Sequence, residues 1–265
     1  MDKNIGTLQE NLVRNMLETQ YIGKDFHFFE ETTSTFDMAE KIAIKNGSVI
    51  CARRQTNGRG RLGRSWESQN GGIYFSIILM PDSRFDEVQI MTALCAVGIR
   101  RALSSFLPCS IKWPNDIVSK DGKKICGILT KLKFTGDGKP IVNVGIGINA
   151  NTKKFDDELK YASSISLISG KDVDENLVLC RSLEEIEKCI SFENFSETME
   201  EYKKECVTLG KRVRVLYAKN DESKTGLCVK IEDDGSLTVE TDDGKLINVN
   251  SGEVSVRGIY GENYV

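Results

Sequence analysis

The apolar positions of the chain alternate between spacings typical of strands and spacings typical of helices. Period-two alternation and short apolar runs predict strands over residues 25–30, 48–55, 72–80, 109–113, 116–120, 122–134 and 139–151. Apolar residues at intervals of three and four predict helices over residues 7–18, 32–47, 86–107, 159–169 and 175–206. Elements mixed in this way predict an α+β fold, in which a mixed or antiparallel sheet is flanked by helices.

The pattern changes beyond Gly210. Several short alternating strands follow, joined by turns at residues 233–235 and 242–245. This is the pattern of a small β-barrel of about 50 residues. We therefore predict two domains, a larger one over residues 1–210 and the barrel over residues 211–265.

Charge and hydropathy exclude several classes of protein. The 265 residues carry a formal net charge of -3, which argues against a general nucleic-acid binder, since such proteins are usually basic. The longest apolar run, residues 72–80, is too short to span a bilayer, and the first residues lack the apolar core of a signal peptide. We therefore expect a cytoplasmic protein that contacts neither membrane nor DNA.

Cysteine and histidine usage restricts the chemistry further. The chain has eight cysteines without a CxxC pair, and several, such as Cys95 and Cys126, lie in apolar runs, so we expect reduced cysteines in the core. The single histidine, His27, argues against a zinc site or a Ser-His-Asp triad. The chemistry is therefore expected to rest on Arg, Lys, Asp and backbone groups.

The Gly/Arg segment, "NGRGRLGRSWESQNGG" over residues 57–72, is the first candidate for a functional site. Its glycines allow close approach of the backbone to a ligand, and its arginines offer planar donors for carboxylate or phosphate. A flexible RNA-binding element of the RGG type has a similar composition. Two predicted strands flank this segment, and Trp66 lies within it, which favours a loop that closes on an anion.

Three further segments carry candidate polar groups. "KWPND", residues 112–116, combines a stiff turn with Trp113 as a stacking surface, although an Asx turn has the same composition. "KKICGIL", residues 123–129, places Lys124 at the start of an apolar strand, where it either meets a buried anion or faces solvent. "NVGIGINAN", residues 143–151, has glycines inside a strand, which indicates close approach of a ligand or another backbone.

These four segments, in this order, resemble the biotin protein ligase family. "QTNGRGRLGRSWES" is similar to the family's GRGRxGRxW biotin loop, and "STF" (Ser34–Phe36) is similar to its Ser-Thr-Asn, with Phe36 in the third position. The resemblance implies a catalytic domain like that of class II aminoacyl-tRNA synthetases and a C-terminal SH3-like barrel. It also implies a monofunctional enzyme, since only about 25 residues precede the first catalytic strand, too few for the winged-helix repressor domain of some members.

The resemblance implies specific site residues. Biotin contacts are expected from Ser34, Thr35, Phe36, Gln55, Arg59, Gly60, Arg61 and Lys124. ATP contacts are expected from Arg61, Arg64, Trp66, Lys112, Asn115 and Asn149. Catalytic roles are expected for Arg59, Arg61, Lys112, Asp116 and Lys124. The implied partners are biotin, ATP with Mg²⁺, and a biotin carboxyl carrier domain such as that of acetyl-CoA carboxylase; the enzyme itself is expected to be a monomer or homodimer.

The implied reaction has two steps with opposite difficulties. The carboxylate of biotin first attacks the α-phosphate of ATP, and two unit charges about 4 Å apart repel by roughly 4 kcal/mol at an effective dielectric near 20. Arginines, a lysine, backbone N–H groups and Mg²⁺ offset that repulsion. In the second step, a carrier lysine with a pKa of about 10.4 must lose its proton, and Asp116 is the candidate that orients or deprotonates it.

Two other functions remain as alternatives. A lipoate–protein ligase shares the adenylation chemistry, but lipoate has no ureido group, and Ser34, Thr35 and Gln55 favour biotin. A non-enzymatic RNA-binding module would use the Gly/Arg segment and the barrel. The acidic pI of about 5.5 argues against that module.

Overall fold

The structure is a computed structural model, and it describes residues 6–42, 45–81, 88–217, 223–251 and 254–257. Seven strands form the central sheet, in the order β1-β2-β5-β9-β8-β7-β6. Strands β1 and β2 are parallel, whereas each of the other neighbouring pairs is antiparallel. The sheet is therefore mixed, as the sequence predicts. Its strands are β1 (Phe26–Thr32), β2 (Val49–Gln55), β5 (Gly72–Leu79), β6 (Cys109–Lys112), β7 (Asp116–Ser119), β8 (Lys124–Phe134) and β9 (Pro140–Asn149).

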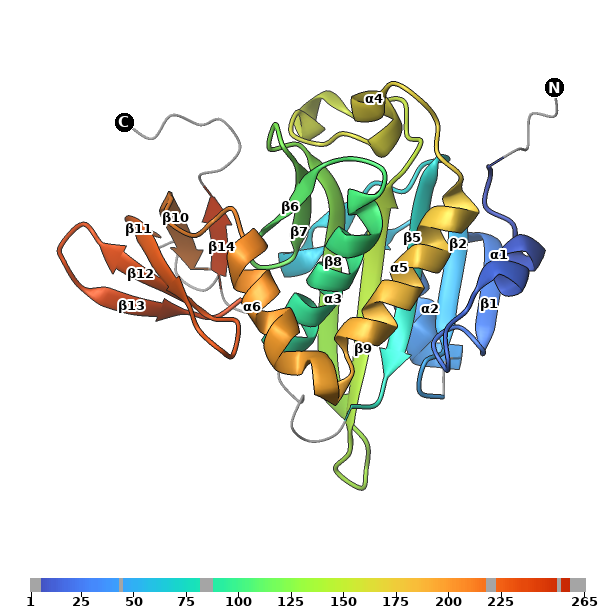
Figure 1. Ribbon diagram of the computed structural model, residues 1–265, viewed down its shortest axis with the longest axis horizontal. Helices are drawn as coiled ribbons and strands as arrows, with labels where there is room; N and C mark the ends of the chain where they lie inside the picture. Colours follow the sequence, from blue (N-terminus) through green and yellow to red (C-terminus); the bar gives the residue numbers. More distant parts are fainter. Residues whose placement is uncertain (1–5, 43–44, 82–87, 218–222, 252–253, 258–265) are drawn as a thin grey trace.

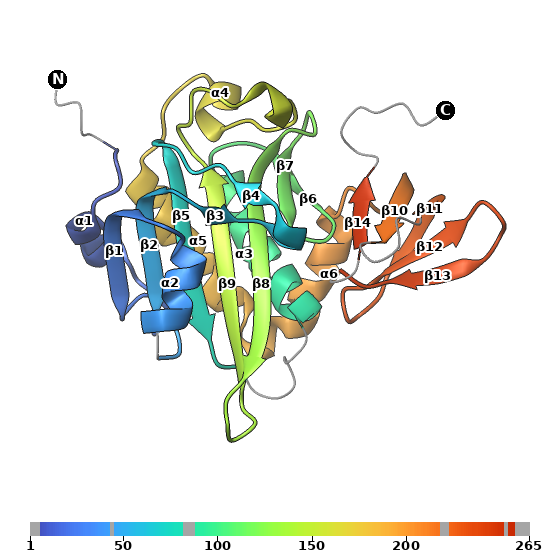
Figure 2. The ribbon, with the colours of Figure 1, turned by 180° about the vertical axis from the view of Figure 1, so that it is seen from behind.

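Helices cover one face of this sheet, and the other face carries the candidate site. Helix α3 lies along the sheet and packs against α5 and α6 (Figure 1). Helix α2 and a small two-stranded hairpin, β3–β4, lie on the opposite face (Figure 2). Strand β5 lies between these layers, so each of its residues is buried. The helices are α1 (Glu10–Met16), α2 (Thr35–Ile42), α3 (Val88–Ser104), α4 (Ile165–Ser169), α5 (Glu175–Cys189) and α6 (Phe195–Glu205).

A separate antiparallel sheet follows α6, with the strand order β13-β12-β11-β10-β14. The indole Nε1 of Trp113 donates a hydrogen bond of 2.9 Å to the carbonyl oxygen of Gly235, which joins this sheet to the larger part of the chain. The predicted division at residues 210 and 211 falls between α6 and the first of these strands. The strands are β10 (Arg212–Tyr217), β11 (Ser223–Ile231), β12 (Leu237–Thr241), β13 (Leu246–Val249) and β14 (Val254–Arg257).

Two predicted helices are wrong in extent. Residues 159–169 form only the end of a short 3-10 turn (Asp157–Leu159) and the five-residue helix α4. The chain between these two elements is hydrogen-bonded to the start of β8, where the N–H of Lys124 donates to the carbonyl oxygen of Tyr161. Residues 175–206 form two helices, because the side chains of Ser191 and Asn194 both donate to the carbonyl oxygen of Lys188 and end α5.

The predictions for two other helices, for the cysteines and for membrane spans can be compared with the residues that the structure describes. The helix predicted over residues 32–47 ends at Ile42 among the described positions, and residues 43–44 lie outside them. Residues 86–87, at the start of another predicted helix, also lie outside the described residues. All eight cysteines are free and buried, as expected. None of the helices in the described ranges is long and apolar enough to cross a membrane.

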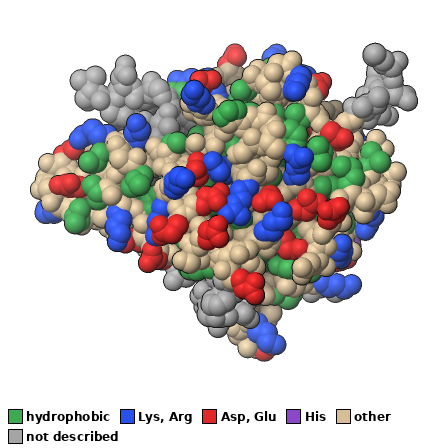
Figure 3. Space-filling view, viewed as in Figure 1, with side chains coloured by type: hydrophobic (Ala, Val, Ile, Leu, Met, Phe, Trp, Pro, Cys, Tyr) green, Lys and Arg blue, Asp and Glu red, His purple; other side chains and the backbone are tan. Residues whose placement is uncertain are grey.

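The helical face carries mixed charge. Basic and acidic side chains alternate across this side of the molecule (Figure 3), and Arg100 and Arg101 both form ion pairs with Glu201. A nucleic-acid-binding surface is usually dominated by positive charge. The helical face is therefore not a surface of that kind, whereas the Gly/Arg segment lies on the opposite face (Figure 2).

Candidate active site

A cavity of about 700 Å³ opens on the face of the sheet that carries α2 and the β3–β4 hairpin. All of the predicted site residues except Asn149 line it: Ser34, Thr35, Phe36, Gln55, Arg59, Gly60, Arg61, Arg64, Trp66, Lys112, Asn115, Asp116 and Lys124. They come from α2, β2, the hairpin and the ends of β6, β7 and β8. Residues more than 80 positions apart in the chain therefore share one cavity.

One end of the cavity holds a connected set of short polar side chains. The backbone N–H of Thr35 donates to Oε1 of Gln55 at 2.8 Å, and Nε2 of Gln55 donates to Oγ of Ser68 at 2.7 Å. The hydroxyl of Ser76 donates to Oγ1 of Thr35 at 3.0 Å. The sequence analysis missed Ser68 and Ser76; the signal for Ser76 was a single hydroxyl in the otherwise apolar stretch of β5.

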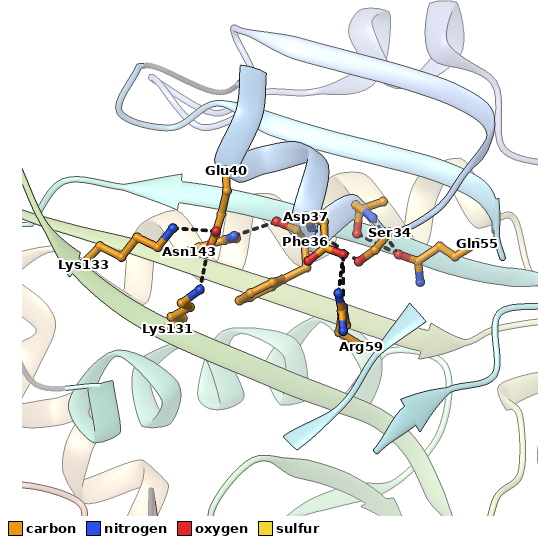
Figure 4. A network of polar contacts seen from close by, with 10 residues as sticks. Ser34, Phe36, Asp37, Glu40, Gln55, Arg59, Lys131, Lys133 and Asn143 are labelled. Carbon is orange, nitrogen blue, oxygen red and sulfur yellow. Dashed lines mark hydrogen bonds and ion pairs between the residues drawn. The ribbon is translucent and has the colours of Figure 1, made fainter. Parts of the chain in front are cut away.

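Phe36 places an aromatic ring beside this polar set. Its ring lies over Gly145 of β9, where an added β-carbon would come within 2.7 Å of the ring. The backbone carbonyl of Phe36 accepts a hydrogen bond of 2.9 Å from Nδ2 of Asn143 (Figure 4). Gly145 therefore leaves room for the aromatic side chain, which closes that part of the cavity with an apolar surface.

The Gly/Arg segment forms a short hairpin rather than an irregular loop. Strand β3 (Gly58–Arg59) pairs with β4 (Ser65–Trp66), and the N–H of Gly60 donates to the carbonyl of Arg64 at 2.7 Å. The turn between them places Leu62 at φ 54° and Gly63 at φ 74°, both in the left-handed region. The hairpin carries its arginines along the mouth of the cavity.

Trp66 covers the floor of the cavity. Its indole lies against Gly127 of β8 and Gly147 of β9, where added β-carbons would approach the ring to 2.6 Å and 2.4 Å. The ammonium of Lys124 lies 5.1 Å from the centre of the ring, within the range of a cation–π contact. Glycines at these two positions therefore make room for an aromatic side chain, whereas the sequence predicted close approach of a ligand or another backbone at Gly147.

Two lysines flank the carboxylate of Asp116. Nζ of Lys124 lies 2.6 Å from Oδ1 of Asp116, and both side chains are largely buried. Lys112 is 4% exposed and is the cross-strand neighbour of Asp116 in the β6–β7 pair. The turn between these strands contains a cis peptide bond between Trp113 and Pro114. Positive charge thus gathers in the cavity around one acidic group.

Arg61 links the hairpin to two other parts of the chain. Its Nη1 donates to Oδ1 of Asn115 at 2.9 Å, and its Nη2 donates to the carbonyl of Ser251 in the C-terminal part. Burial lowers the pKa of the Arg61 guanidinium, and the nearby charge of Asp116 opposes that shift. Arg61 thereby ties the hairpin to the "KWPND" turn and to the chain after β13.

Asn149 lies outside the cavity lining, whereas Trp113 borders the cavity but directs its indole N–H to a structural contact. Asn149 is 4% exposed, and its Nδ2 donates to the carbonyl of Ser163 at 3.1 Å, outside the cavity lining. The side chain of Trp113, expected as a stacking surface, is 2% exposed and joined to Gly235 instead. Both side chains lie next to the site, but neighbouring residues bury them. Their hydrogen bonds therefore stabilise the fold.

The described residues contain no group of three His, Cys, Asp or Glu side chains arranged to hold a metal ion. Mg²⁺ in nucleotide sites is commonly held by one or two carboxylates together with the phosphates of the substrate. Asp116 is a carboxylate in the cavity suited to that role, although it already pairs with Lys124.

Comparisons with known proteins agree with this geometry. Residues 28–151 match the model of the biotin/lipoate A/B protein ligase family, and residues 208–257 match that of the biotin protein ligase C-terminal domain. A bifunctional ligase/repressor BirA from Bacillus spizizenii is 33% identical over 256 residues, which cover 91% of this chain and 77% of that protein. A biotin–[acetyl-CoA-carboxylase] ligase from Mycobacterium tuberculosis is 28% identical, over 79% of each chain.

Solved structures are similar as well. A biotin protein ligase from Aquifex aeolicus, in complex with biotin and ATP, superposes with a TM-score of 0.77 at 32% identity, covering 88% of this chain and 99% of that one. A biotin protein ligase from Leishmania major, in complex with biotin, has a TM-score of 0.58 at 26% identity, covering 86% of this chain and 99% of that one. The matches cover both the mixed sheet with its cavity and the C-terminal sheet. This chain is therefore a member of the biotin protein ligase family.

Proposed function

We propose that this protein activates biotin with ATP to form biotinyl-5′-AMP and transfers the biotinyl group to a lysine of a biotin carboxyl carrier domain. One observation carries the proposal: a single cavity brings together the polar residues Ser34, Thr35 and Gln55, the hairpin arginines and the Lys124–Asp116 pair. These are the groups that a ureido ring, an anionic reaction centre and an attacking amine require.

The ureido ring of biotin binds at the polar end, and its carboxylate extends toward Lys124. A cyclic urea has one acceptor and two donors, which match the hydroxyl and amide groups of Ser34, Thr35 and Gln55. Phe36 and Gly145 offer an apolar wall for the fused rings. Arg61, Arg64, Trp66, Lys112 and Asn115 are assigned to the adenylate, beside the carboxylate.

The first step depends on the cations around the cavity. Both reacting groups are anionic, and their mutual repulsion, roughly 4 kcal/mol at about 4 Å, corresponds to about a thousandfold in rate. Arg59, Arg61 and Lys124 lie where they offset that charge as the two anions approach. Because these groups are already positioned by the fold, little reorganisation is needed during the reaction.

The second step depends on Asp116. An approaching carrier lysine is protonated at neutral pH, and a carboxylate beside the mixed anhydride orients the ammonium and accepts its proton. The carrier domain is proposed to dock beside the hairpin, so that its lysine enters the cavity from the mouth. Asp116 is the carboxylate that would hold Mg²⁺ together with the phosphates of ATP, and the ion would supply further positive charge for the first step.

A lipoate ligase is the second candidate within the same superfamily. Its substrate has no ureido group, so the hydrogen-bonding capacity that Ser34, Thr35 and Gln55 retain beyond their mutual bonds would face an apolar ring, which is costly when buried. These three residues therefore favour biotin over lipoate.

A direct experiment separates these possibilities. The purified protein is incubated with MgATP and either biotin or lipoate, and bound adenylate is identified by mass spectrometry. We expect biotinyl-5′-AMP with biotin and transfer to an added biotin carboxyl carrier domain. Adenylate formed with lipoate alone, or none with either acid, would contradict the proposal.

A further inference from the structure

Asp37 is a charged residue beside the cavity that the sequence motifs do not include. It lies in the first turn of α2, directly after the cavity residues Ser34, Thr35 and Phe36. Its Oδ2 accepts hydrogen bonds from Nε of Arg59 at 3.1 Å and from Nη2 of Arg59 at 3.0 Å (Figure 4). One carboxylate oxygen therefore holds two donors of an arginine that lines the mouth of the cavity.

The backbone around Asp37 is firmly held. The N–H of Thr35 is bonded to Gln55 of β2, and the carbonyl of Phe36 is bonded to Asn143 of β9. The N–H of Met38 donates to the carbonyl of Ser34 at 3.0 Å and begins the helix. The first turn of α2 is thus fixed to two strands of the central sheet.

Arg59 belongs to a much less extensive element. The β3–β4 hairpin has two residues in each strand, and residues 62–65 at its turn are exposed. A two-stranded hairpin is at best marginally stable by itself, so its position depends on contacts with the rest of the chain. The hairpin contacts described above are Trp66 on the sheet, Arg61 at Asn115 and Ser251, and Arg59 at Asp37.

We propose that Asp37 is a positioning residue, which anchors the hairpin to α2 through Arg59 and so slows the escape of the bound adenylate. The anchoring of the hairpin concerns the ligand-free protein, whereas the slower escape of the adenylate rests on the proposed function. The Arg59 and Asp37 side chains are 50% and 32% exposed, so the pair contributes little to the stability of the whole fold. Its effect is expected on the hairpin, which must move before ligand can leave the cavity.

Glu40 provides a matched control on the same helix. It lies about one turn after Asp37 and forms ion pairs with Lys131 at 2.9 Å and Lys133 at 2.5 Å, both on β8 (Figure 4). It is not among the residues that line the cavity, and its carboxylate is directed at β8 and not at the hairpin. Glu40→Gln therefore removes an α2 ion pair of similar chemistry without releasing Arg59.

The test measures amide hydrogen exchange of residues 58–66 in the ligand-free protein. Asp37→Asn is expected to speed exchange there by about two- to fivefold, the range set by an exposed ion pair, while Glu40→Gln leaves it unchanged. Asp37→Glu keeps the charge and is expected to restore part of the protection. In 1 M NaCl the difference between wild type and Asp37→Asn is expected to shrink, because salt screens the pair.

The functional consequence is measured separately, as the dissociation rate of biotinyl-5′-AMP. We expect Asp37→Asn to release it about two to five times faster than wild type, with a melting temperature close to that of wild type. Unchanged exchange in Asp37→Asn, or an equal change in Glu40→Gln, would overturn the anchoring role. If the wild type forms no adenylate, the proposed function fails, whereas the exchange measurement still decides on Asp37.

Discussion

The indole of Trp66 lies on Gly147 so closely that a β-carbon on the glycine would be 2.4 Å from Nε1. The hairpin tryptophan and the strand glycine, 81 positions apart in the sequence, therefore depend on each other. The site tolerates a large aromatic ring on the sheet because the strand beneath it has no side chain there.

Gly147→Ala is expected to displace Trp66 and with it β4 of the hairpin. The substitution introduces a contact that real β-carbons do not make, so the ring must shift away from the floor of the cavity. We expect the affinity for biotin to fall by about tenfold or more, measured by calorimetry. Gly136→Ala is the control, since a β-carbon at Gly136 meets no other atom within 4 Å. Equal affinities for both variants would show that the indole position is unimportant.

Asp116→Asn is expected to slow transfer to the carrier lysine more than adenylate formation. The amide keeps the shape of the side chain but can no longer accept a proton from the attacking ammonium, a role worth about a hundredfold. The two half-reactions are followed separately, by pyrophosphate exchange and by transfer from preformed adenylate. Glu158→Gln, which removes another carboxylate lining the cavity, should change neither strongly. An equal loss in both half-reactions would mean that Asp116 acts mainly by holding Lys124, 2.6 Å away.

Glu175 is expected to make the stability of the fold depend on pH. Burial raises the pKa of its carboxyl group, although hydrogen bonds from the N–H of Leu8 and from Asn151 oppose this shift. The folded chain then binds the proton more tightly than the unfolded chain. This contribution to the free energy of unfolding is complete below the ordinary pKa of glutamate and is lost as the pH rises through the raised value.

Glu175→Gln tests that dependence. Both carboxylate oxygens accept N–H donors, so a glutamine must turn its own NH₂ toward one of them. We expect a loss of about 1–3 kcal/mol in the free energy of unfolding at pH 5 and a smaller loss at pH 8, measured by urea denaturation. Glu197→Gln, an exposed position on α6, should show little loss at either pH. A deficit that grows with pH would contradict the assigned direction of the pKa shift.

Trp113→Phe is expected to weaken the attachment of the C-terminal sheet. Phenylalanine fills most of the same volume but lacks the N–H that donates to Gly235. We expect the free energy of unfolding to fall by about 1–3 kcal/mol, the range for a lost buried hydrogen bond. Trp66→Phe is the matched control for stability, because the described residues offer its indole N–H no acceptor. If both variants lose the same amount, ring volume rather than the hydrogen bond explains the change.

Much of this fold is predictable from local pattern. Strand alternation and helical spacing depend on residues a few positions apart, so the seven strands and the helices α2, α3 and α5 could be located before any tertiary contact was known. The errors occurred where a side chain or a neighbouring strand competes for the backbone. Ser191 and Asn194 end α5, and β8 bonds the chain near Tyr161 that was predicted to be helical.

The sequence by itself determined the chemistry of the site. Its motifs name arginines, lysines, a carboxylate and small polar groups in an order that resembles one family, and all but Asn149 of the predicted residues line one cavity. Those motifs are short, and their residue types have side chains that donate or accept hydrogen bonds or carry charge.

Only the tertiary structure decided which of these groups meet. Ser76 donates to Thr35, Asp37 accepts from Arg59, and Trp113 donates to Gly235 beside the C-terminal sheet, although no local pattern shows which partner each of them meets. The physical reason is that hydrogen bonds and van der Waals contacts act over a few ångströms, whereas these partners are between 22 and 122 positions apart along the chain. Their proximity depends on how the whole sheet and its covering layers pack together.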